Sequence, residues 1–403
     1  MRYWDAVFAF LVAMGVAAGL TPVAAATARR VGILAHPSER GLARTDTPVL
    51  GGLAILAGVL VASLIWVPAT IYLPHTAHGR PGPGGVVHTW ALIAGACLIT
   101  LVGVIDDARE LRWYWKLAGQ IAAALVVVEG GAVVTDVTLP FLGSLQFPNA
   151  GGVLTVIWLV GLMNVVNFSD GVDGLAAGLC TIDGVAFAVI AFDLGVNSAG
   201  TLAALTAGAS LGFLFYNFHP ASVFMGDSGA NLLGYLLGVA AVVGSLKTNA
   251  VVALVVPLVI LAVPFLDTSF VVAKRLKYHR RPWDADANHF HHRMARIGFS
   301  QRKTVAYMYA WSLLLAGVAV ALRFVPYSDH HGHYRLGWSL VMGALGLVAL
   351  AASVYLIYVL EILKFKHWRL RELRRLDPGT SEFEVEAAVA RDIETGEFER
   401  VSS

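Results

Sequence analysis

The chain has 403 residues, of which 57% are hydrophobic and 14% are charged, with a formal net charge of +2 and a mean hydropathy of +0.68. Soluble globular domains carry about 25% charged residues, so this composition excludes a soluble globular protein. It predicts an all-α polytopic membrane protein, and we expect no nucleic-acid partner.

Apolar runs close to the ~20 residues that cross a bilayer recur along the chain. We expect 10 or 11 transmembrane helices in one integral membrane domain over residues 1–363. The first run ends in three alanines, as a signal peptide can, but with so many later runs it is better read as an uncleaved helix. The candidate runs cover residues 4–28, 50–73, 88–105, 115–129, 152–168, 175–193, 200–218, 230–246, 250–272, 304–323 and 337–363.

The basic residues predict the orientation of these helices. When alternate connecting segments are placed on one side, that side holds all but five of the 29 Lys and Arg residues. We therefore expect an outer N-terminus and a cytoplasmic C-terminus. The exceptions are Arg2, Arg80, Lys247, Arg323 and Arg335.

Two further segments are predicted outside the helices. Residues 133–148 alternate β-forming residues and end near Pro148, which favours a short periplasmic β-hairpin. Residues 364–403 form a basic and then acidic cytoplasmic tail that we expect to be partly disordered. The basic part suits anionic lipid headgroups, or it is an ordinary positive-inside signal.

Five polar clusters interrupt the apolar sequence, and the same orientation places all of them on the cytoplasmic side. Charged residues at membrane helix ends are expensive to desolvate and therefore point to function. We expect one acidic, Asn-rich site in cytoplasmic loops, suited to a divalent metal that handles phosphates. The clusters are Asp106-Asp107, Asn164–Gly174, Asn217, Phe224–Gly229 and His289–Arg293.

The first cluster, Asp106-Asp107, closes an apolar run. Adjacent carboxylates can hold Mg²⁺ together with water and phosphate oxygens, and one of them could act as a base. A plain helix terminus explains the pair equally well.

The second cluster repeats polar residues every three positions: Asn164, Asn167, Asp170 and Asp173. On a continuous helix, all four would lie along one face. The glycine after each aspartate allows the backbone to turn or to approach a ligand closely. The alternative is a structural network of buried amides and carboxylates.

The remaining clusters place Asn217 and Phe224 before Asp227, and histidines in a basic loop. Phe224 could stack on a base or a sugar, or simply pack. The loop residues could supply phosphate donors or bind zinc; they are His289, His291, His292 and Arg293. A similar group, His330, His331 and His333, is expected on the outer face, and we give it no role.

Taken in order, these motifs over residues 37–305 resemble the polyprenyl-phosphate N-acetylhexosamine-1-phosphate transferases, glycosyltransferase family 4. The resemblance implies transfer of a sugar 1-phosphate from a UDP-sugar to a polyprenyl phosphate (undecaprenyl or decaprenyl), with release of UMP. It implies Mg²⁺ or Mn²⁺ as the cofactor, a bacterial plasma membrane location and a role in cell-envelope glycan synthesis. A homodimer is one of the oligomeric states left open.

The His-x-His-His-Arg motif, followed by Gly298-Phe-Ser-Gln-Arg302, is similar to the WecA/TagO-like branch, which implies UDP-GlcNAc as the donor. The alternative is phospho-MurNAc-pentapeptide translocase activity or another UDP-N-acetylhexosamine. One loop departs from the branch pattern, because Gly41 and Ala43 replace the usual Lys and His. Arg40 or Arg44 is the candidate replacement for that basic group.

The resemblance also implies roles for individual residues. Asp227 and Asn167 would hold the metal, and Asp106 or Asp107 would deprotonate or position the lipid phosphate. Asp170 and Asn164 would support the site, with Asn217 and Arg44 among the substrate-binding residues. Phe168, Asp173 and Phe224 would surround the uracil, and the histidines and arginine of the 289–293 cluster would surround the diphosphate and sugar.

A secondary transporter is the remote alternative, with Asp267 inside an apolar run as its best support. Transporters place coupling residues near the membrane midplane within related repeats. Here the acidic residues gather at one side, and no repeat is visible in the sequence.

Overall fold

The computed structural model describes residues 3–35, 46–72, 86–134, 136–139, 143–146, 150–245, 300–325, 335–351 and 353–354. Most of these residues are helical, and one helix, Leu336–Ala351, carries no label. The labelled helices are α1 (Tyr3–Val31), α2 (Gly51–Trp66), α3 (Thr89–Arg109), α4 (Trp113–Glu129), α5 (Gly151–Ser169), α6 (Leu175–Asp193), α7 (Asn197–Asn217), α8 (Gly226–Ser245) and α12 (Gln301–Phe324).

The helices confirm the all-α polytopic membrane fold. The predicted apolar runs within the described residues form helices, except that α2 ends at Trp66 and residues 70–72 of the predicted run 50–73 form a strand. Seven of the described helices are long and apolar enough to cross a membrane. α2 and α4 are shorter, with 16 and 17 residues. The predicted run 250–272 and the predicted tail 364–403 lie outside the described residues.

Three small antiparallel pairs of strands connect the helices in the described residues. The pair β5–β6 confirms the hairpin that the sequence predicts over residues 133–148. The strands are β1 (Leu34–Ala35) with β2 (Thr47–Pro48), β3 (Thr70–Tyr72) with β4 (Val86–His88), and β5 (Asp136–Leu139) with β6 (Gly143–Gln146).

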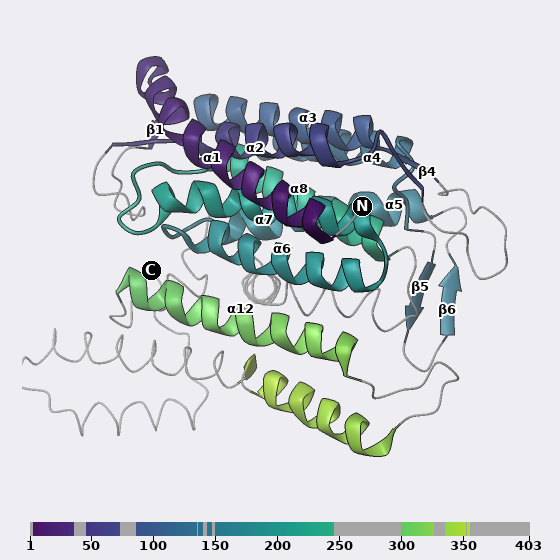
Figure 1. Ribbon diagram of the computed structural model, residues 1–403. Coiled ribbons are helices and arrows are strands. Elements are labelled where there is room, and N and C mark those ends of the chain that lie inside the picture. The colour runs from purple at the N-terminus through teal and green to yellow at the C-terminus, as the bar shows by residue number, and fades with distance from the viewer. Residues whose placement is uncertain are drawn as a thin grey trace, which may run out of the picture.

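The helices run alternately up and down, so their ends gather at two opposite ends of the bundle. β1 lies at one end and the β5–β6 hairpin at the other (Figure 1). The polar motifs at the ends of α3, α5 and α7 and at the start of α8 share the β1 end, as contacts between their residues show below. We call this the polar end of the bundle.

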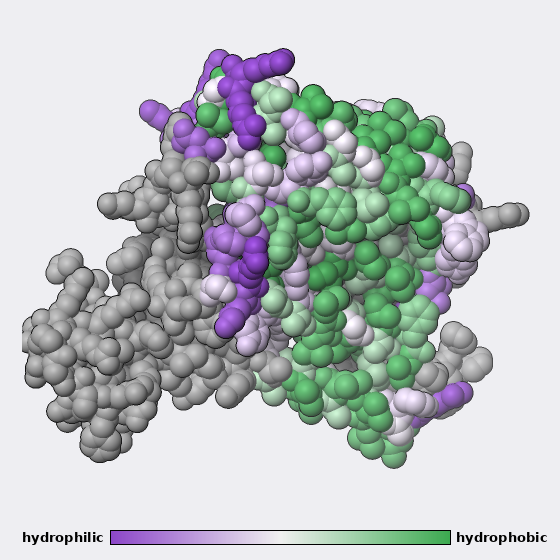
Figure 2. Space-filling view, turned by 60° about the vertical axis from the view of Figure 1, so that its left-hand side comes forward, coloured by the Kyte–Doolittle hydropathy of each residue, from purple (hydrophilic) through white to green (hydrophobic). Residues whose placement is uncertain are grey.

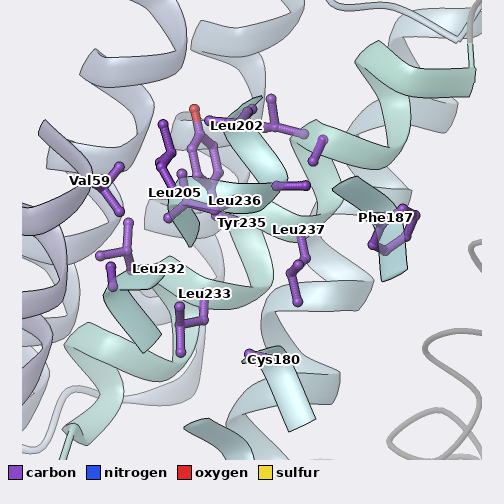
Figure 3. Packing of buried hydrophobic residues seen from close by; sticks show 14 of the residues in the cluster. Val59, Cys180, Phe187, Leu202, Leu205, Leu232, Leu233, Tyr235, Leu236 and Leu237 are labelled. Carbon is purple, nitrogen blue, oxygen red and sulfur yellow. The ribbon is translucent and has the colours of Figure 1, made fainter. Parts of the chain in front are cut away.

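Helix α8 is the central element of the bundle and packs against α2, α3, α5, α6 and α7. In the most apolar 18-residue stretch of α8, 89% of the residues are buried, the largest share among the described helices that could span a membrane. Leu232, Leu233 and Leu236 are buried in the hydrophobic core, as is Leu205 of α7 (Figure 3). The Tyr235 hydroxyl donates a hydrogen bond to the Leu92 carbonyl of α3 at 2.9 Å, so this buried polar group is satisfied.

Small residues allow α1 and α7 to approach each other closely. A Cβ atom at Gly208 would lie 2.1 Å from the Phe10 carbonyl oxygen, and one at Gly212 would lie 2.2 Å from that of Met14. The α1 face is a row of buried alanines, which includes Ala9 and Ala13. Lipid offers helices no hydrophobic reason to associate, so close backbone packing of this kind stabilises the contact.

Polar contacts join α12 to α6 along most of their length. The Tyr309 hydroxyl donates to the Gly174 carbonyl at 2.5 Å, and the Ser312 hydroxyl donates to Asp183 at 3.0 Å. At the other end of the pair, the Arg323 guanidinium lies 2.5 Å from the Asp193 carboxylate. Asp183 is 1% exposed and lies in the middle of α6.

The described surface is strongly apolar where lipid would contact it. Figure 2 shows a broad hydrophobic area, with hydrophilic residues gathered mainly at its margins. Large apolar side chains stand exposed on several helices, among them Leu64, Trp90 and Leu101. An apolar area of this size on a soluble protein would be a site of aggregation, so it supports a membrane location.

Candidate active site

The site begins at the N-terminus of α8, where Asp107 of α3 caps the helix. Its carboxylate accepts hydrogen bonds from the backbone amides of Asp227, at 2.7 Å, and Ser228, at 3.2 Å. These amides belong to the first turn of a helix, where backbone N–H groups lack partners within the helix. Asp107 thus stabilises the position of Asp227 and has both oxygens engaged.

Gly226 makes this cap possible. Its φ angle is +68°, a conformation that side chains disfavour. A Cβ atom at this position would also lie 2.5 Å from the Asp107 carboxylate. Both the backbone conformation and the lack of space therefore require a glycine at the first position of the Gly-Asp-Ser-Gly motif.

Lys116, in the first turn of α4, is the residue on which the site converges. Its ammonium contacts the Asp227 carboxylate and lies 3.2 Å from Asp106 Oδ2 and 3.3 Å from Asn167 Oδ1. Asp227 also accepts a hydrogen bond from the Asn167 amide. Oxygen atoms from three helices, α3, α5 and α8, therefore surround one cation.

Sequence reasoning missed Lys116 and counted it only among the basic residues that set the orientation. The one available signal was its position four residues after Arg112, at the start of an apolar run and close behind the Asp106-Asp107 pair. That signal is weak, because a lysine at such a place usually serves the positive-inside pattern.

Asp106 differs from its neighbour in what it faces. It is 8% exposed; one carboxylate oxygen accepts from the Leu111 amide at 2.7 Å, and the other faces Lys116. The two adjacent aspartates therefore have separate structural settings. Asp107 binds the α8 backbone, and Asp106 presents an oxygen to the cationic centre.

A second layer of amide side chains supports this centre. Asn164 donates to Gln120 at 2.8 Å, and Gln120 donates to Asn231 at 2.8 Å. Asn231 in turn donates to the Asp227 carbonyl at 2.7 Å. Asn164 is therefore linked to Asp227 through Gln120 and Asn231, and its predicted roles stay predictions.

The Asn164–Gly174 motif spans the end of α5 and the turn that follows it, in agreement with the predicted apolar runs 152–168 and 175–193. α5 ends at Ser169, so Asn164 and Asn167 are helical, while Asp170 is the residue after the helix and Asp173 lies in the following turn. Gly174, with φ of +78°, then leads into α6. Burial raises the pKa of Asp170 well above the usual carboxyl range, and the nearby Asp227 and Asp107 raise it further.

Asn217 and Asp173 connect this turn to the loop before α8. Asn217 accepts from the Gly174 amide and donates to the Val223 carbonyl, both at 3.0 Å. Asp173 lies 2.8 Å from the ring Nδ1 of His219, a residue that the sequence reasoning did not single out. Asn217 is 2% exposed, so in this structure its side chain holds two loops together.

Phe224 and Phe168 are both partly buried near these residues in the chain. The Phe224 amide donates to the Pro48 carbonyl at 2.9 Å, and the Phe224 carbonyl accepts from the Gly51 amide at 3.0 Å. The start of α2 is thereby attached to the loop before α8. The first connecting loop and the Phe224–Gly229 motif meet at the polar end, as the sequence predicts.

Several predicted site residues lie outside the described residues. They are His289, His291, His292, Arg293 and Arg44, together with Arg40, Gly41 and Ala43 of the first loop. Asp267 and the group His330, His331 and His333 lie outside them as well. Their predicted roles stay predictions.

The donor set at the centre suits a hard divalent cation. Among the described residues, no group of three or more His, Cys, Asp or Glu side chains forms a metal cluster. Mg²⁺ needs no such cage, because one or two carboxylates with water and phosphate oxygens are enough. Asp227, Asp106 and the Asn167 amide oxygen already surround one cation, the Lys116 ammonium.

The fold and this centre together define a class: a multi-pass membrane protein in which acidic and amide side chains from several helix ends meet around a lysine. Comparison with known proteins narrows the class. The pattern of glycosyl transferase family 4 matches residues 89–245, which hold the whole described centre. The chain belongs to this family.

Its relatives carry two kinds of name. A probable undecaprenyl-phosphate N-acetylglucosaminyl 1-phosphate transferase of Bacillus subtilis is 33% identical over 79% of this chain and 85% of its own. A decaprenyl-phosphate N-acetylglucosaminephosphotransferase of Mycolicibacterium smegmatis is 36% identical over 74% of this chain and 77% of its own. A phospho-N-acetylmuramoyl-pentapeptide-transferase of Desulforamulus reducens is 32% identical over 73% and 86%.

Proposed function

We propose that this protein transfers GlcNAc 1-phosphate from UDP-GlcNAc to a polyprenyl phosphate, forming polyprenyl-diphosphate-GlcNAc and UMP. The relatives named for N-acetylglucosamine phosphate transfer, at 33–36% identity, support this choice. The observation that carries it is the convergence of Asp227, Asp106 and Asn167 on one cation at the polar end of a membrane bundle.

In the proposed reaction, an oxygen of the lipid phosphate attacks the phosphorus that bears the sugar. The new P–O bond forms as the bond from that phosphorus to the UMP oxygen breaks, and UMP leaves. Phosphoryl transfer of this kind depends mainly on in-line positioning and on neutralising charge. A rigid, charged centre at a membrane surface is suited to both tasks.

We assign Mg²⁺, or Mn²⁺, to this centre, held by Asp227 and Asn167. When bound, it would supply positive charge beside the phosphates. The protein's own contribution is positional: the Asp107 cap holds the backbone of Asp227, and the Asn231 amide binds its carbonyl. Lys116 adds a fixed positive charge beside the same carboxylate.

We assign the lipid phosphate to Asp106. Asp107 is less suited, because both of its oxygens accept hydrogen bonds from α8 amides. Asp106 has one oxygen directed at Lys116, so an incoming phosphate could share that ammonium. Asp106 can then position the phosphate or accept its proton.

The donor would occupy the remaining polar residues at this end. We assign Phe168, Asp173 and Phe224 to the nucleoside. The diphosphate and the sugar would fall to the predicted loop residues of the 289–293 cluster.

We place the site at the cytoplasmic face of a bacterial plasma membrane. Arg29, Arg30, Arg109 and Arg112 all lie at the ends of helices that reach the polar end. An excess of Lys and Arg marks the cytoplasmic side of bacterial membrane proteins. Cytoplasmic access would also give the site its nucleotide sugar.

The test is a purified, detergent-solubilised chain with undecaprenyl phosphate, Mg²⁺ and a panel of UDP-sugars, with UMP release as the readout. We expect UMP release with UDP-GlcNAc and none without the lipid. Release only with UDP-MurNAc-pentapeptide would favour the second candidate function, transfer of phospho-MurNAc-pentapeptide, which the pentapeptide-transferase relatives support. Substrate movement across liposomes without UMP release would overturn both.

A further inference from the structure

His219 lies in the loop between α7 and α8 and forms a defined pair with Asp173. Its Nδ1 atom lies 2.8 Å from Asp173 Oδ2, and the same oxygen accepts from the Ala221 amide at 3.1 Å. The histidine side chain is 28% exposed, whereas that of Asp173 is 11% exposed. One edge of the ring is thus held by a mostly buried carboxylate, while part of the ring reaches the surface.

The backbone around this pair is held on three sides. Asn217 binds the Gly174 amide and the Val223 carbonyl, and the Arg302 guanidinium donates to the His219 carbonyl at 3.4 Å. Further along the same loop comes the partly exposed Phe224, and Asp227 follows in the first turn of α8. A hydrogen-bonding ring, an aromatic ring and the cationic centre therefore follow one another along a fixed segment.

The contact with Asp173 determines what the other ring nitrogen can do. An ionised carboxylate only accepts hydrogen bonds, so Nδ1 carries a hydrogen atom and donates a hydrogen bond to the Asp173 carboxylate. In the neutral imidazole, Nε2 then carries a lone pair and is an acceptor. A partner fixed in this way sets the tautomer of a histidine.

We propose that His219 is a specificity-determining residue that recognises the uracil of the donor nucleotide, with Nε2 accepting a hydrogen bond from the N3–H group. This inference rests on the proposed use of a UDP-sugar. With phosphates at the Asp227 centre, we place the base toward Phe224 and His219, which precede Asp227 by three and eight residues in the chain. Cytosine carries a lone pair at N3 and would face the Nε2 lone pair, so the same contact would reject it.

The experiment measures UMP and CMP binding to the detergent-purified full chain by calorimetry. In His219→Asn, the amide can still donate to Asp173 but places no atom at the Nε2 position. We expect UMP to bind about tenfold more weakly, the usual effect of one lost hydrogen bond. CMP binding should change less than about twofold, so the preference for UMP should largely disappear.

Ser222→Ala is the matched control. Ser222 is an exposed residue of the same loop, and its hydroxyl donates only to the Tyr216 carbonyl among the contacts described. Binding of both nucleotides should be unchanged in this variant. A His219→Asn protein that keeps full UMP affinity, or that loses UMP and CMP affinity equally, would overturn the inference.

A second measurement needs no variant. UMP methylated at N3 has no N3–H and should bind the unaltered protein at least about tenfold more weakly than UMP. Equal binding of the two would overturn the inference. UMP release from UDP-GlcNAc without any preference for UMP over CMP would refute this inference alone, while His219-dependent preference without turnover would refute the proposed transfer alone.

Discussion

Two contact regions of the bundle are stabilised in opposite ways. Along α1 and α7, glycines and alanines bring two backbones close together. At the N-terminus of α8, Asp227, Asp106 and Lys116 form a contact made of charge and hydrogen bonds. An added side-chain atom would disrupt the packing of the first region, whereas loss of a charge would disrupt the interactions of the second.

This difference separates stability from function within one membrane domain. Changes of shape at the α1–α7 contact should affect folding and leave the chemistry of the folded protein intact. Changes of charge at the centre, with shape preserved, should do the reverse. Each prediction below tests one side of this division.

The largest effect is expected for Asp227→Asn, which keeps the shape of the side chain and removes its charge. A neutral amide is a poorer ligand for a hard cation, so UMP release should fall at least about a thousandfold, equivalent to ~4 kcal/mol of barrier. The melting temperature should stay within a few degrees of the parent protein. Near-normal turnover of this variant at limiting Mg²⁺ would show that Asp227 is not a metal ligand.

The next effect is on stability, in Gly212→Ala. The added Cβ would lie 2.2 Å from the Met14 carbonyl oxygen, so α1 must move away. Overpacking of this kind costs about 1–3 kcal/mol, which a lower melting temperature in detergent should reveal, with the KM values unchanged. Gly161→Ala is the control, because nothing lies within 4 Å of its Cβ position; an equal loss there would contradict the close-packing argument.

Asp107→Asn tests the cap at the boundary between the two regions. One of the two α8 amides loses its acceptor, because the new NH₂ group cannot accept a hydrogen bond. Loss of a helix cap costs about 0.5–2 kcal/mol, so the melting temperature should fall more than in Asp106→Asn. Asp106→Asn should instead lose mainly turnover. If the two variants had matching melting temperatures and activities, the separate roles given to these aspartates would be wrong.

The smallest effect is expected for Asp183→Asn, a polar change within the packed part of the bundle. The amide oxygen can still accept the Ser312 hydroxyl, so turnover should stay within about twofold, a shift of only ~0.4 kcal/mol. Measuring UMP release and thermal stability of the variant checks this. Complete loss of function would show that the buried carboxylate must titrate, as in a proton-coupled transporter.

The sequence predicted the helices and the location of the polar clusters well, because both depend on local composition. A run of ~20 apolar residues in a membrane forms a helix because only a helix satisfies all of its backbone hydrogen bonds within the run itself. Polar groups at its ends contrast with the apolar run, which is why the sequence alone groups Asp106-Asp107, Asn167 and Asp227 in one site.

The rest depended on contacts between distant segments, which no local pattern reports. The role of Asp107 as a cap for α8 joins residues 120 positions apart. Lys116 looked like an ordinary basic residue until α4 placed it against α8. The helix end at Ser169 lies one residue beyond the predicted run 152–168, but the pairing of Asp173 with His219 after it joins residues 46 positions apart.

The three contacts between α6 and α12 determine the register of the two helices. Interhelical hydrogen bonds inside a membrane average only about 0.6 kcal/mol, so Tyr309, Ser312 and Arg323 add little affinity. The three partners lie at different heights along the helix pair, however, so sliding α12 by one turn would break all three contacts at once and leave the buried Asp183 without its Ser312 partner. The apolar surface of α12 would allow many alignments with α6, and these weak contacts select one of them.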